Sequence, residues 1–290
     1  MEYQGVVIRP PSEARSLILQ VTHGCSNNKC TFCPTYKGTR FRIKDQQQIE
    51  AEIDEVSSLF PYRRVFLADG DALIIPQPRL TAIMARLSNK IRGLERVGIY
   101  GNAKSILRKS VDDLCELKRL GLGIIYLGLE SGDPQVLDAI KKGVAPKQMI
   151  EAAQRVKQSG ILLSVTVLLG IAGKDGGERH ARLTAEVLNS MQPDYVGALT
   201  LMVVPGSPLY EQMLDNSFKM PGVFEMLGEL RTMLAGLELN NCLFTSNHAS
   251  NYLPLKVRLP AQKAHALQMI DEVIDSGDQR RLRPEFLRAL

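Results

Sequence analysis

Six apolar segments, separated by stretches with helical spacing, constrain the fold of this chain more than any other feature. Each segment is a nearly continuous hydrophobic run, as in strands that are buried on both faces. The segments cover residues 17–22, 64–69, 97–101, 124–129, 162–169 and 195–203. Strands that alternate with helices in this way predict a parallel sheet covered by helices on its outside. Right-handed crossovers then permit either an open doubly wound sheet or a barrel.

Local signals mark the ends of the helices and a change of pattern in the tail. Asp45 precedes Gln48 at capping-box spacing, and Asp133 caps a helix that has a proline in its first turn. From residue 205 onward, helical stretches surround a polar loop at residues 245–252. We expect three parts, which are an N-terminal arm over residues 1–16, a core over 17–210, and a C-terminal helical extension over 211–290 that packs on the core.

Composition excludes several classes of protein. At 290 residues with 44% hydrophobic residues, the chain has enough apolar material for one α/β barrel. The net charge of +5 is mild, and nucleic-acid binders usually concentrate their charge on one face. No apolar signal segment is visible, and the longest apolar run, 161–172, is too short to span a bilayer. We therefore expect a cytoplasmic protein with no membrane or nucleic-acid partner, whose cysteines are thiols or metal ligands.

Three of the five cysteines lie on the loop after the first expected strand. Cys25, Cys30 and Cys33 have C-x4-C-x2-C spacing. Three thiolates on one loop can bind a metal or a cluster, but they cannot fill four positions. A [4Fe–4S] cluster normally takes one cysteine on each iron, so three ligands leave one iron open. An open metal position is where chemistry occurs.

A structural zinc site is the alternative for this loop. His23 lies two residues before Cys25, and three cysteines with one histidine could form a closed zinc site. Zinc motifs usually pair their ligands as two short knuckles on small modules, whereas a core of this size needs no metal to fold. The spacing therefore favours the cluster. Cys115 and Cys242 are isolated in the sequence and cannot build a second cluster by themselves.

The cysteine loop, with Phe32 before its last cysteine, resembles the C-x3-C-x2-C loop of radical S-adenosylmethionine (SAM) enzymes, with one residue more in the first spacer. Asp69-Gly70-Asp71 resembles the glycine-rich motif that binds the amino group of SAM in that superfamily. The later motifs are similar to those of the branch that contains anaerobic coproporphyrinogen oxidase and the elongator and methylthiotransferase enzymes. They are Gly128 to Gly132, Lys142-Gly143, Leu169 to Gly173 and Pro205 to Tyr210.

The resemblance implies an α/β fold, a partial (β/α)6 barrel with a C-terminal helical extension. It places a [4Fe–4S] cluster and SAM at the carboxyl ends of the strands, which is the catalytic edge of barrel folds. In the family, the open iron binds SAM, one low-potential electron cleaves the sulfonium, and the resulting radical takes a hydrogen atom from the substrate. An electron donor such as flavodoxin or ferredoxin is therefore an expected partner.

The resemblance also assigns roles to individual residues. Cys25, Cys30 and Cys33 would bind the cluster. Gly70, flanked by Asp69 and Asp71, would offer backbone carbonyls to the SAM ammonium, although a tight turn also explains this glycine. The other expected SAM contacts are Phe32 and Val204 against adenine, Asn102 and Thr166 at the ribose, Glu130 with Ser131 at the ribose or amino acid part, and Lys142 at the carboxylate. The alternatives are core packing, satisfied polar groups, a helix-end acid and a solvated lysine.

Residues for a substrate are the last set. His248, Asn251 and Arg40 are the candidate catalytic residues. His248 and Asn251 lie on the polar loop near the C-terminus, where His248 could be a proton donor or a substrate anchor, and an ordinary surface loop is the alternative. Arg40, close to Tyr36, Lys37 and Arg42, could hold an anionic substrate or brace the cysteine loop. The sequence as a whole predicts a radical SAM oxidoreductase or transferase that acts on a small, anionic substrate. The alternative is a non-enzymatic metal protein, either a zinc scaffold or an iron–sulfur electron carrier.

Overall fold

The computed structural model describes residues 1, 3–59 and 61–289, and its backbone forms two compact units. The first unit comprises residues 1–28, 35–127 and 151–163, and the second comprises residues 29–34, 128–150 and 164–290. Three elements, β6, β7 and α6, have residues in both units. The two units are described separately below.

Parallel strands form the sheet of the first unit, in the order β1-β4-β5-β6. Leu17 lies opposite Val65, and Val65 lies opposite Val97, so the apolar runs of three strands are in register. The strands are β1 (Leu17–Gln20), β4 (Arg64–Ala68), β5 (Arg96–Tyr100) and β6 (Leu122–Glu130), with a separate antiparallel pair β2 (Thr22–His23) and β3 (Arg42–Ile43).

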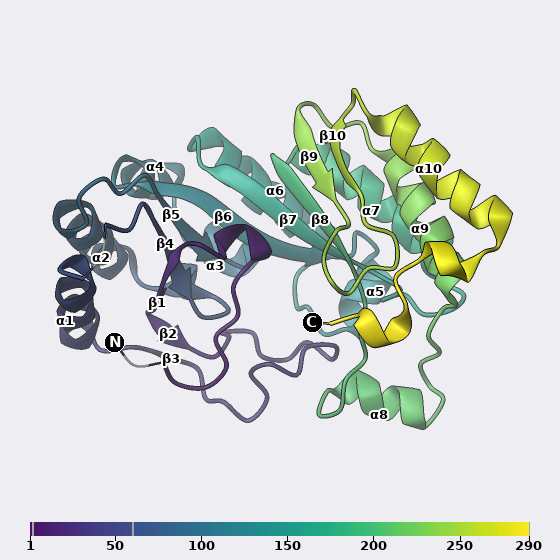
Figure 1. Ribbon diagram of the computed structural model, residues 1–290. Helices are drawn as coiled ribbons and strands as arrows, with labels where there is room; N and C mark the ends of the chain where they lie inside the picture. Colours follow the sequence, from purple (N-terminus) through teal and green to yellow (C-terminus); the bar gives the residue numbers. More distant parts are fainter. Residues whose placement is uncertain (2, 60, 290) are drawn as a thin grey trace. The chain divides into compact units, whose positions relative to one another are not determined.

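Helices cover one face of these strands (Figure 1). The predicted cap at Asp45 is confirmed, because its carboxylate accepts hydrogen bonds from the backbone N–H groups of Gln47 and Gln48. The first helix then buries Ile49, Ile53 and Val56 against the sheet side. The helices are α1 (Gln46–Ser57), α2 (Gln77–Lys90), α3 (Ala103–Leu107) and α4 (Val111–Arg119), with short 3-10 turns η1 (Pro11–Glu13) and η2 (Ala72–Ile74).

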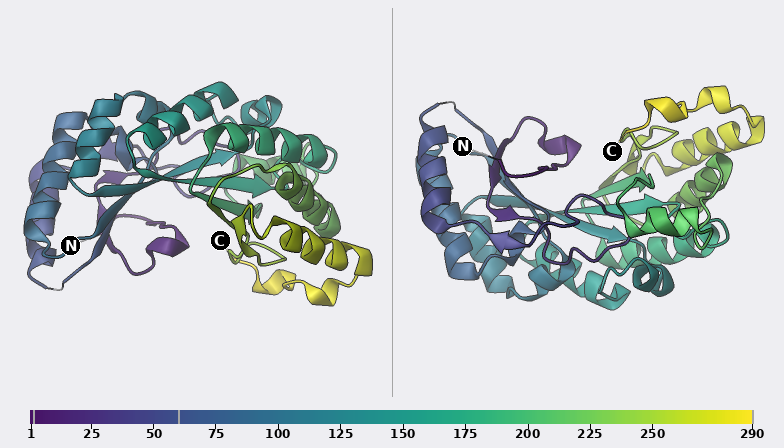
Figure 2. Two further views of the ribbon diagram at one scale, coloured as in Figure 1. Left: turned by 90° about the horizontal axis from the view of Figure 1, so that it is seen from above. Right: turned by 90° about the horizontal axis from the view of Figure 1, so that it is seen from below.

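The N-terminal arm lies on the opposite face of the same strands from the helices (Figure 2). Glu13 is fully buried there and accepts hydrogen bonds from the Tyr126 hydroxyl and the Arg96 guanidinium. A Cβ atom at Gly98 would lie 3.1 Å from the Glu13 carboxylate, so the arm makes close contact with β5. The arm is therefore anchored to the inner face of the sheet by a buried, charge-assisted network.

The second unit continues the alternation of strands and helices. Its strands follow the order β7-β8-β9-β10, in which the first three are parallel and the last is antiparallel. They are β7 (Leu162–Leu169), β8 (Tyr195–Thr200), β9 (Cys242–Thr245) and β10 (Lys256–Leu259). The helices are α5 (Pro134–Ala139), α6 (Pro146–Gln158), α7 (Gly177–Met191), α8 (Pro208–Leu214), α9 (Val223–Gly236) and α10 (Lys263–Ser276), followed by η3 (Gln279–Arg281) and η4 (Glu285–Leu287).

All six strands expected from the sequence are present, and the sheet is mostly parallel as predicted. The expected helices of the C-terminal part, α9 and α10, are present, and this part also adds β9 and β10, which the sequence analysis did not anticipate. Thr166 lies inside β7, three residues before its last residue, rather than at its end. In the part of the chain that the structure describes, no helix has the length and apolar character needed to cross a membrane.

Candidate active site

The cysteine loop connects β2 to β3, and its three cysteines are thiols with intermediate exposure. Cys25 belongs to the first unit, and Cys30 and Cys33 belong to the second. Within residues 1, 3–59 and 61–289, no group of three or more His, Cys, Asp and Glu side chains is arranged to hold a metal ion. The assignment of cluster ligands therefore rests on the sequence spacing, and the geometry around the loop is built below within each unit.

Asp71 accepts hydrogen bonds from several polar side chains near the carboxyl ends of β4 and β5 in the first unit. Its side chain is fully buried, and Oδ2 accepts hydrogen bonds from Ser105 Oγ (2.6 Å), Asn102 Nδ2 (2.8 Å) and Ser26 Oγ. Burial raises the pKa of Asp71, although these hydrogen bonds oppose the shift. Because Ser26 follows Cys25 directly, Asp71 connects the start of the cysteine loop to the carboxyl edge of the sheet.

Asp69 holds the same loop at a second point. Its Oδ2 accepts hydrogen bonds from the Gly24 backbone N–H (3.1 Å) and from Gln20 Nε2 (3.0 Å), and its own N–H donates to Thr22 Oγ1 (2.9 Å). The residue is only 2% exposed, and its Oδ1 has no hydrogen-bond partner among the described residues. Burial raises the pKa of Asp69.

Gly70 lies between these two aspartates, and a side chain at this position would force its neighbours to shift. A Cβ atom here would lie 2.7 Å from the Tyr36 ring and 3.1 Å from Cys25 Cβ. The backbone of the Asp69-Gly70-Asp71 segment therefore makes close contact with the start of the cysteine loop. We call this close contact of Gly70 with Tyr36 and Cys25 the cradle. It fits a cofactor that is bound at Cys25 and contacts the carbonyl groups of the glycine motif.

Glu130 and Lys142 form an ion pair of 2.8 Å in the second unit, and their side chains are only 10% and 12% exposed. Glu130 has a positive φ of 64°, which is uncommon outside glycine and is concentrated at functional sites. A Cβ atom at Gly128 would lie 2.2 Å from Glu130 Oε1 and 3.1 Å from Lys142 Nζ, so this glycine makes room for the pair. Lys142 is thus not the solvated lysine of the alternative interpretation.

The segment that carries Cys30 and Cys33 is fixed to the second unit by backbone and apolar contacts. Thr31 N–H donates to Ile140 O (3.0 Å), and Leu209 N–H donates to Thr31 O (2.9 Å). Phe32 is partly buried and packs against an apolar cluster between α5 and α8. The cluster consists of Val136, Leu137, Ile140, Leu168, Ile171, Leu201 and Leu209. This packing favours the interpretation of Phe32 as a core residue rather than as an adenine contact. Val204, three residues after Leu201, is half-buried.

A buried network at the end of β6 was missed by the sequence analysis. Ser131 Oγ lies 2.8 Å from His180 Nδ1, and His180 Nε2 lies 3.3 Å from Glu229 Oε1, which accepts the Gly170 N–H at 2.9 Å. These contacts connect the loop after β6 to the loop after β7 through α7 and α9, although His180 Nε2 has no hydrogen-bond partner among the described residues. The sequence contained one sign of this network. Glu229 lies on the apolar face of its helix, one residue before the buried Leu230, and an acid at such a position indicates a buried polar partner.

The buried polar side-chain atoms of the loop near the C-terminus, described residues 246–252, all have hydrogen-bond partners. Asn251 is 2% exposed, its Oδ1 accepts from Thr200 Oγ1 (2.8 Å), and its Nδ2 donates to Ala198 O (3.0 Å). His248 Nδ1 is bonded to Ser250, and burial lowers the pKa of His248, with a smaller contribution from Arg283. Arg283 donates to the carbonyl oxygens of three residues in this loop. These bonds favour a structural role for the loop.

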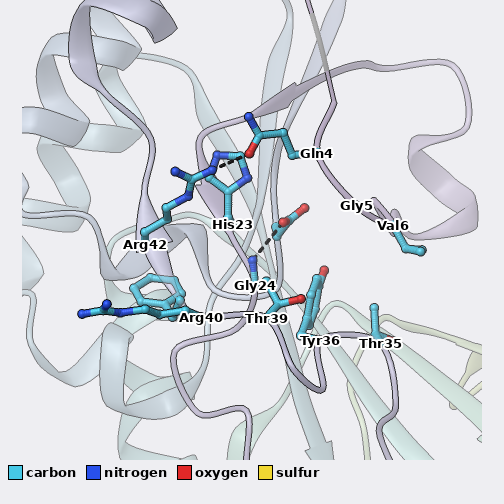
Figure 3. A pocket seen from close by; sticks show the side chains of 12 residues that line it. Gln4, Gly5, Val6, His23, Gly24, Thr35, Tyr36, Thr39, Arg40 and Arg42 are labelled. Carbon is cyan, nitrogen blue, oxygen red and sulfur yellow. Dashed lines mark hydrogen bonds between the residues drawn. The ribbon is translucent and has the colours of Figure 1, made fainter. Parts of the chain in front are cut away.

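The arginines beyond the cysteine loop line a cavity of about 710 Å³ in the first unit (Figure 3). Arg40 and Arg42 contribute to its wall together with His23 and Tyr36. In Figure 3 the Arg42 guanidinium lies beside His23 and Gln4, whereas Arg40 extends away from Tyr36. Tyr36, Arg40 and Arg42 of the predicted group line this cavity, and Arg42 faces the other polar groups. Lys37, the fourth member, does not line it, and its Nζ donates to Asn28 O (3.0 Å).

A family model described as the radical SAM superfamily matches residues 19–183, which is more than half of the chain. This chain belongs to the radical SAM superfamily. It is therefore an enzyme whose cofactors are a [4Fe–4S] cluster and SAM. Their expected protein contacts, at Cys25 and Gly70, fit the cradle described above.

The chain is also similar to individual proteins, one of which is a methylthiotransferase of the expected branch. It is 24% identical over 203 residues to an uncharacterized methyltransferase of Pyrococcus horikoshii, covering 69% of this chain and 42% of the relative. It is 26% identical over 175 residues to a tRNA-2-methylthio-N(6)-dimethylallyladenosine synthase of Dehalococcoides mccartyi, covering 58% of this chain and 41% of the relative. The chain thus spans less than half the length of these curated relatives.

The fold of a solved radical SAM enzyme is similar as well. Coproporphyrinogen III oxidase of Escherichia coli superposes with a TM-score of 0.59 at 14% sequence identity, over 76% of this chain and 51% of that enzyme. At this identity the likeness concerns the fold alone. The predicted radical SAM type of α/β fold, a partial barrel, is therefore confirmed.

Proposed function

We propose that this radical SAM enzyme cleaves SAM reductively and abstracts a hydrogen atom from a small, anionic substrate. The observation that carries the proposal is the cradle at Gly70, where a motif expected to bind SAM touches a cysteine expected to bind the cluster. When bound, the cluster and SAM supply a low-potential electron and a carbon radical. The chain's own residues have to hold these groups, orient them and exclude water.

Three cysteines are the proposed cluster ligands. Cys25, Cys30 and Cys33 have the right chemistry, because thiolates are the ligands that iron–sulfur clusters take. The loop segment before Cys25 is restrained by hydrogen bonds to Asp69 and Asp71, and the segment around Cys30 is restrained by the Thr31 backbone bonds. Because a single insertion in a loop is easily absorbed, we propose that the extra spacer residue does not prevent ligation.

The SAM contacts are proposed in two groups. The carbonyl oxygens around Gly70 would accept hydrogen bonds from the SAM ammonium, and Asn102 is held beside them by Asp71. In the second unit, Glu130 would accept hydrogen bonds from SAM hydroxyl or ammonium groups while the ion pair with Lys142 orients its carboxylate. Ser131 is proposed to support Glu130 rather than to contact SAM, because its hydroxyl is fully buried and bonded to His180.

Methyl or methylthio transfer is a second candidate, favoured by the names of two relatives. The two reactions differ in what remains after turnover. Hydrogen abstraction yields 5′-deoxyadenosine in both, whereas a methyl transfer that consumes SAM also yields S-adenosylhomocysteine. Product analysis therefore separates them.

The test is anaerobic purification followed by reduction with a chemical reductant, or with flavodoxin or ferredoxin as the proposed donor. We expect a brown protein with about four irons per chain, which releases 5′-deoxyadenosine from SAM. A colourless protein that contains zinc and leaves SAM intact would contradict the proposal.

A further inference from the structure

Three buried polar side chains, Ser131, His180 and Glu229, form a network whose role in the proposed function is limited so far to the support of Glu130 by Ser131. Ser131 and His180 are fully buried, and Glu229 is only 3% exposed. All three belong to the second unit. Burial of polar groups costs free energy unless they are hydrogen-bonded, so the groups to which this network bonds indicate what it does.

The network does not activate its serine. A serine, a histidine and an acid in contact also occur in hydrolases, where the serine attacks the substrate. Ser131 is 0% exposed, and its Oγ already accepts the N–H of Asp133, the residue that caps α5, at 2.9 Å. A substrate therefore has no access to this hydroxyl. The bonds of the network hold backbone instead.

Two hydroxyl groups determine which ring nitrogen of His180 carries the proton. Ser131 Oγ accepts the Asp133 N–H and lies 2.8 Å from His180 Nδ1. Thr184 Oγ1 accepts the Gly132 N–H at 2.8 Å and lies 3.4 Å from the same nitrogen. Each hydroxyl has one proton, which remains available for Nδ1. Nδ1 is therefore the acceptor, and the ring proton is on Nε2.

Glu229 supplies the charge at the other end of the network. Its Oε1 accepts the Gly170 N–H at 2.9 Å and lies 3.3 Å from His180 Nε2, in contact with it but without a hydrogen bond. A Cβ atom at Gly177 would lie 3.0 Å from Oε2 of the same carboxylate. Gly177 is the first residue of α7, and the N-terminal end of a helix stabilises a negative charge. The carboxylate therefore faces the proton on Nε2 and favours the ring orientation in which Nδ1 accepts from Ser131.

The backbone that follows Glu130 is held against α7 at the first end of the network. Gly132 N–H donates to Thr184 Oγ1, and a Cβ atom at Gly132 would lie only 2.4 Å from Leu183 O. Glu130 has a φ of 64°, and such a conformation persists only where its surroundings determine it. The network and α7 thus fix the backbone after Glu130, while Lys142 pairs with its carboxylate.

We propose that His180 and Glu229 are positioning residues for SAM. His180, oriented by Glu229, accepts the hydrogen bond from Ser131 and so keeps residues 130–133 in the conformation in which Glu130 binds SAM. Because Glu229 also accepts the Gly170 N–H, the same network restrains the loop after β7. The inference rests on the proposed function at one point, which is the contact between Glu130 and SAM.

The first measurement needs no SAM. Long-range proton–nitrogen correlation spectra of the oxidised holoprotein show which nitrogen of each histidine carries the proton, and the His180 signal is the one that is absent in His180→Asn. We expect the proton on Nε2. Backbone hydrogen exchange at residues 131–133 should be roughly tenfold faster or more in His180→Phe, which removes both ring nitrogens. It should stay close to the wild-type rate in His180→Asn, whose amide oxygen can replace Nδ1 as the acceptor.

The second measurement is SAM binding by isothermal titration calorimetry to the oxidised holoprotein, in which no turnover occurs. His180→Phe should weaken SAM binding roughly tenfold or more. Glu229→Gln should weaken it by a smaller factor, because the ring keeps its bond to Ser131 but loses the charge that orients it. His180→Asn should bind SAM nearly as tightly as the wild type.

Ser246→Ala is the matched control for lost stability. Ser246 is 1% exposed, and its hydroxyl donates to Leu253 O and accepts the Leu255 N–H, in the same unit but outside the network. This variant should be less stable than the wild type and bind SAM equally well. If His180→Phe does not fold, Ser131→Ala replaces it, because it removes the other partner of the same hydrogen bond and the same hydroxyl group as the control.

The outcomes separate this inference from the proposed function. Weaker SAM binding in His180→Phe that His180→Asn restores supports the positioning role, even if the reduced wild type fails to cleave SAM. Unchanged SAM affinity in His180→Phe overturns the inference, as does a proton on Nδ1, even if SAM is cleaved. Equal losses of affinity in His180→Phe and Ser246→Ala would show an effect of stability alone and would also overturn it. A wild type that does not bind SAM overturns both the inference and the proposed function.

Discussion

Two polar regions of this protein look alike in sequence and differ in their hydrogen bonds. Residues 69–71 and their neighbours in the first unit keep an unpartnered buried oxygen, Asp69 Oδ1, and a glycine beside a cysteine. Residues 246–252 in the second unit are as rich in polar side chains, yet Asn251 is bonded to Thr200 and Ala198, and His248 is bonded to Ser250. No buried side-chain atom of the described residues 246–252 lacks a partner. The difference separates a region prepared for a ligand from a braced loop.

The comparison teaches that polarity alone does not mark a site. A buried polar group whose bonds are complete has no capacity left for a substrate, and removing it costs stability. A buried group with an unused lone pair already bears a desolvation cost that a ligand can relieve. The following experiments test this distinction, starting with the largest expected effect.

The first prediction tests the proposed cluster ligands on the cysteine loop. Cys30→Ala should abolish iron binding and SAM cleavage, because one of the three proposed thiolate ligands is lost. The matched control is Cys115→Ala on α4, outside the loop, which should keep its iron and its activity. Iron content and 5′-deoxyadenosine release are the measurements. Full iron occupancy in Cys30→Ala would remove this cysteine from the ligand set.

The second prediction concerns the buried pair Glu130 and Lys142. Glu130→Gln should weaken SAM binding roughly tenfold or more, because hydrogen bonds to charged groups contribute about 1.5–3 kcal/mol. It should also destabilise the protein, since Lys142 would remain buried without its counter-charge. Calorimetric titration with SAM and thermal unfolding measure the two effects.

A double variant separates these effects. In Glu130→Gln with Lys142→Met, stability should recover in part while SAM binding stays weak. If SAM affinity recovers together with stability, the role of Glu130 is structural, and the proposed SAM contact is wrong.

Much of this contrast could not be read from the sequence, for a physical reason. The strands and the caps at Asp45 and Asp133 were predictable because apolar runs and capping depend on neighbouring residues. The resemblance also placed the cluster and SAM, and with them the Cys25 loop and the Gly70 motif, at the carboxyl ends of the strands. The bonding state of Asn251, by contrast, depends on Thr200 and Ala198, about fifty residues away, and no local pattern encodes it.

The same limit explains the other surprises. His180 and Glu229 meet across two helices, so only the acid on an apolar helix face hinted at them. The strands β9 and β10 are four residues each, and their apolar runs are too short to stand out from the helical stretches around them.

The third prediction tests the braced loop. Asn251→Ala removes two buried hydrogen bonds and should lower the free energy of unfolding by about 1–3 kcal/mol for each group left unpaired. Release of 5′-deoxyadenosine at a temperature where the variant is folded should stay close to the wild-type rate. Denaturant unfolding and the activity assay together decide the case. Lost activity with unchanged stability would instead make Asn251 a substrate or cofactor residue.

The last and smallest effect concerns the C-terminal residues that brace this loop. Burial and the hydrogen bond to Glu285 raise the pKa of Tyr252 to about 12 from its ordinary value of 10.0. The unfolded chain therefore ionises Tyr252 at a lower pH than the folded protein does. This contribution to stability is fully present below pH 10 and is lost as the pH rises toward 12.

Tyr252→Phe lacks this group, so its stability should fall less steeply than that of the wild type over the same pH window. Arg288 opposes this rise in the pKa of Tyr252, because its positive charge favours the ionised phenol. It donates to the Tyr252 hydroxyl and to Glu285, and its guanidinium lies 4.1 Å from the ring centre. Ultraviolet titration of tyrosinate in the wild type and in the variant identifies the late-ionising phenol. If the variant instead loses a phenol that ionises near the ordinary pKa of 10.0, Tyr252 is open to solvent, and the C-terminal residues do not brace the loop as tightly as its hydrogen bonds imply.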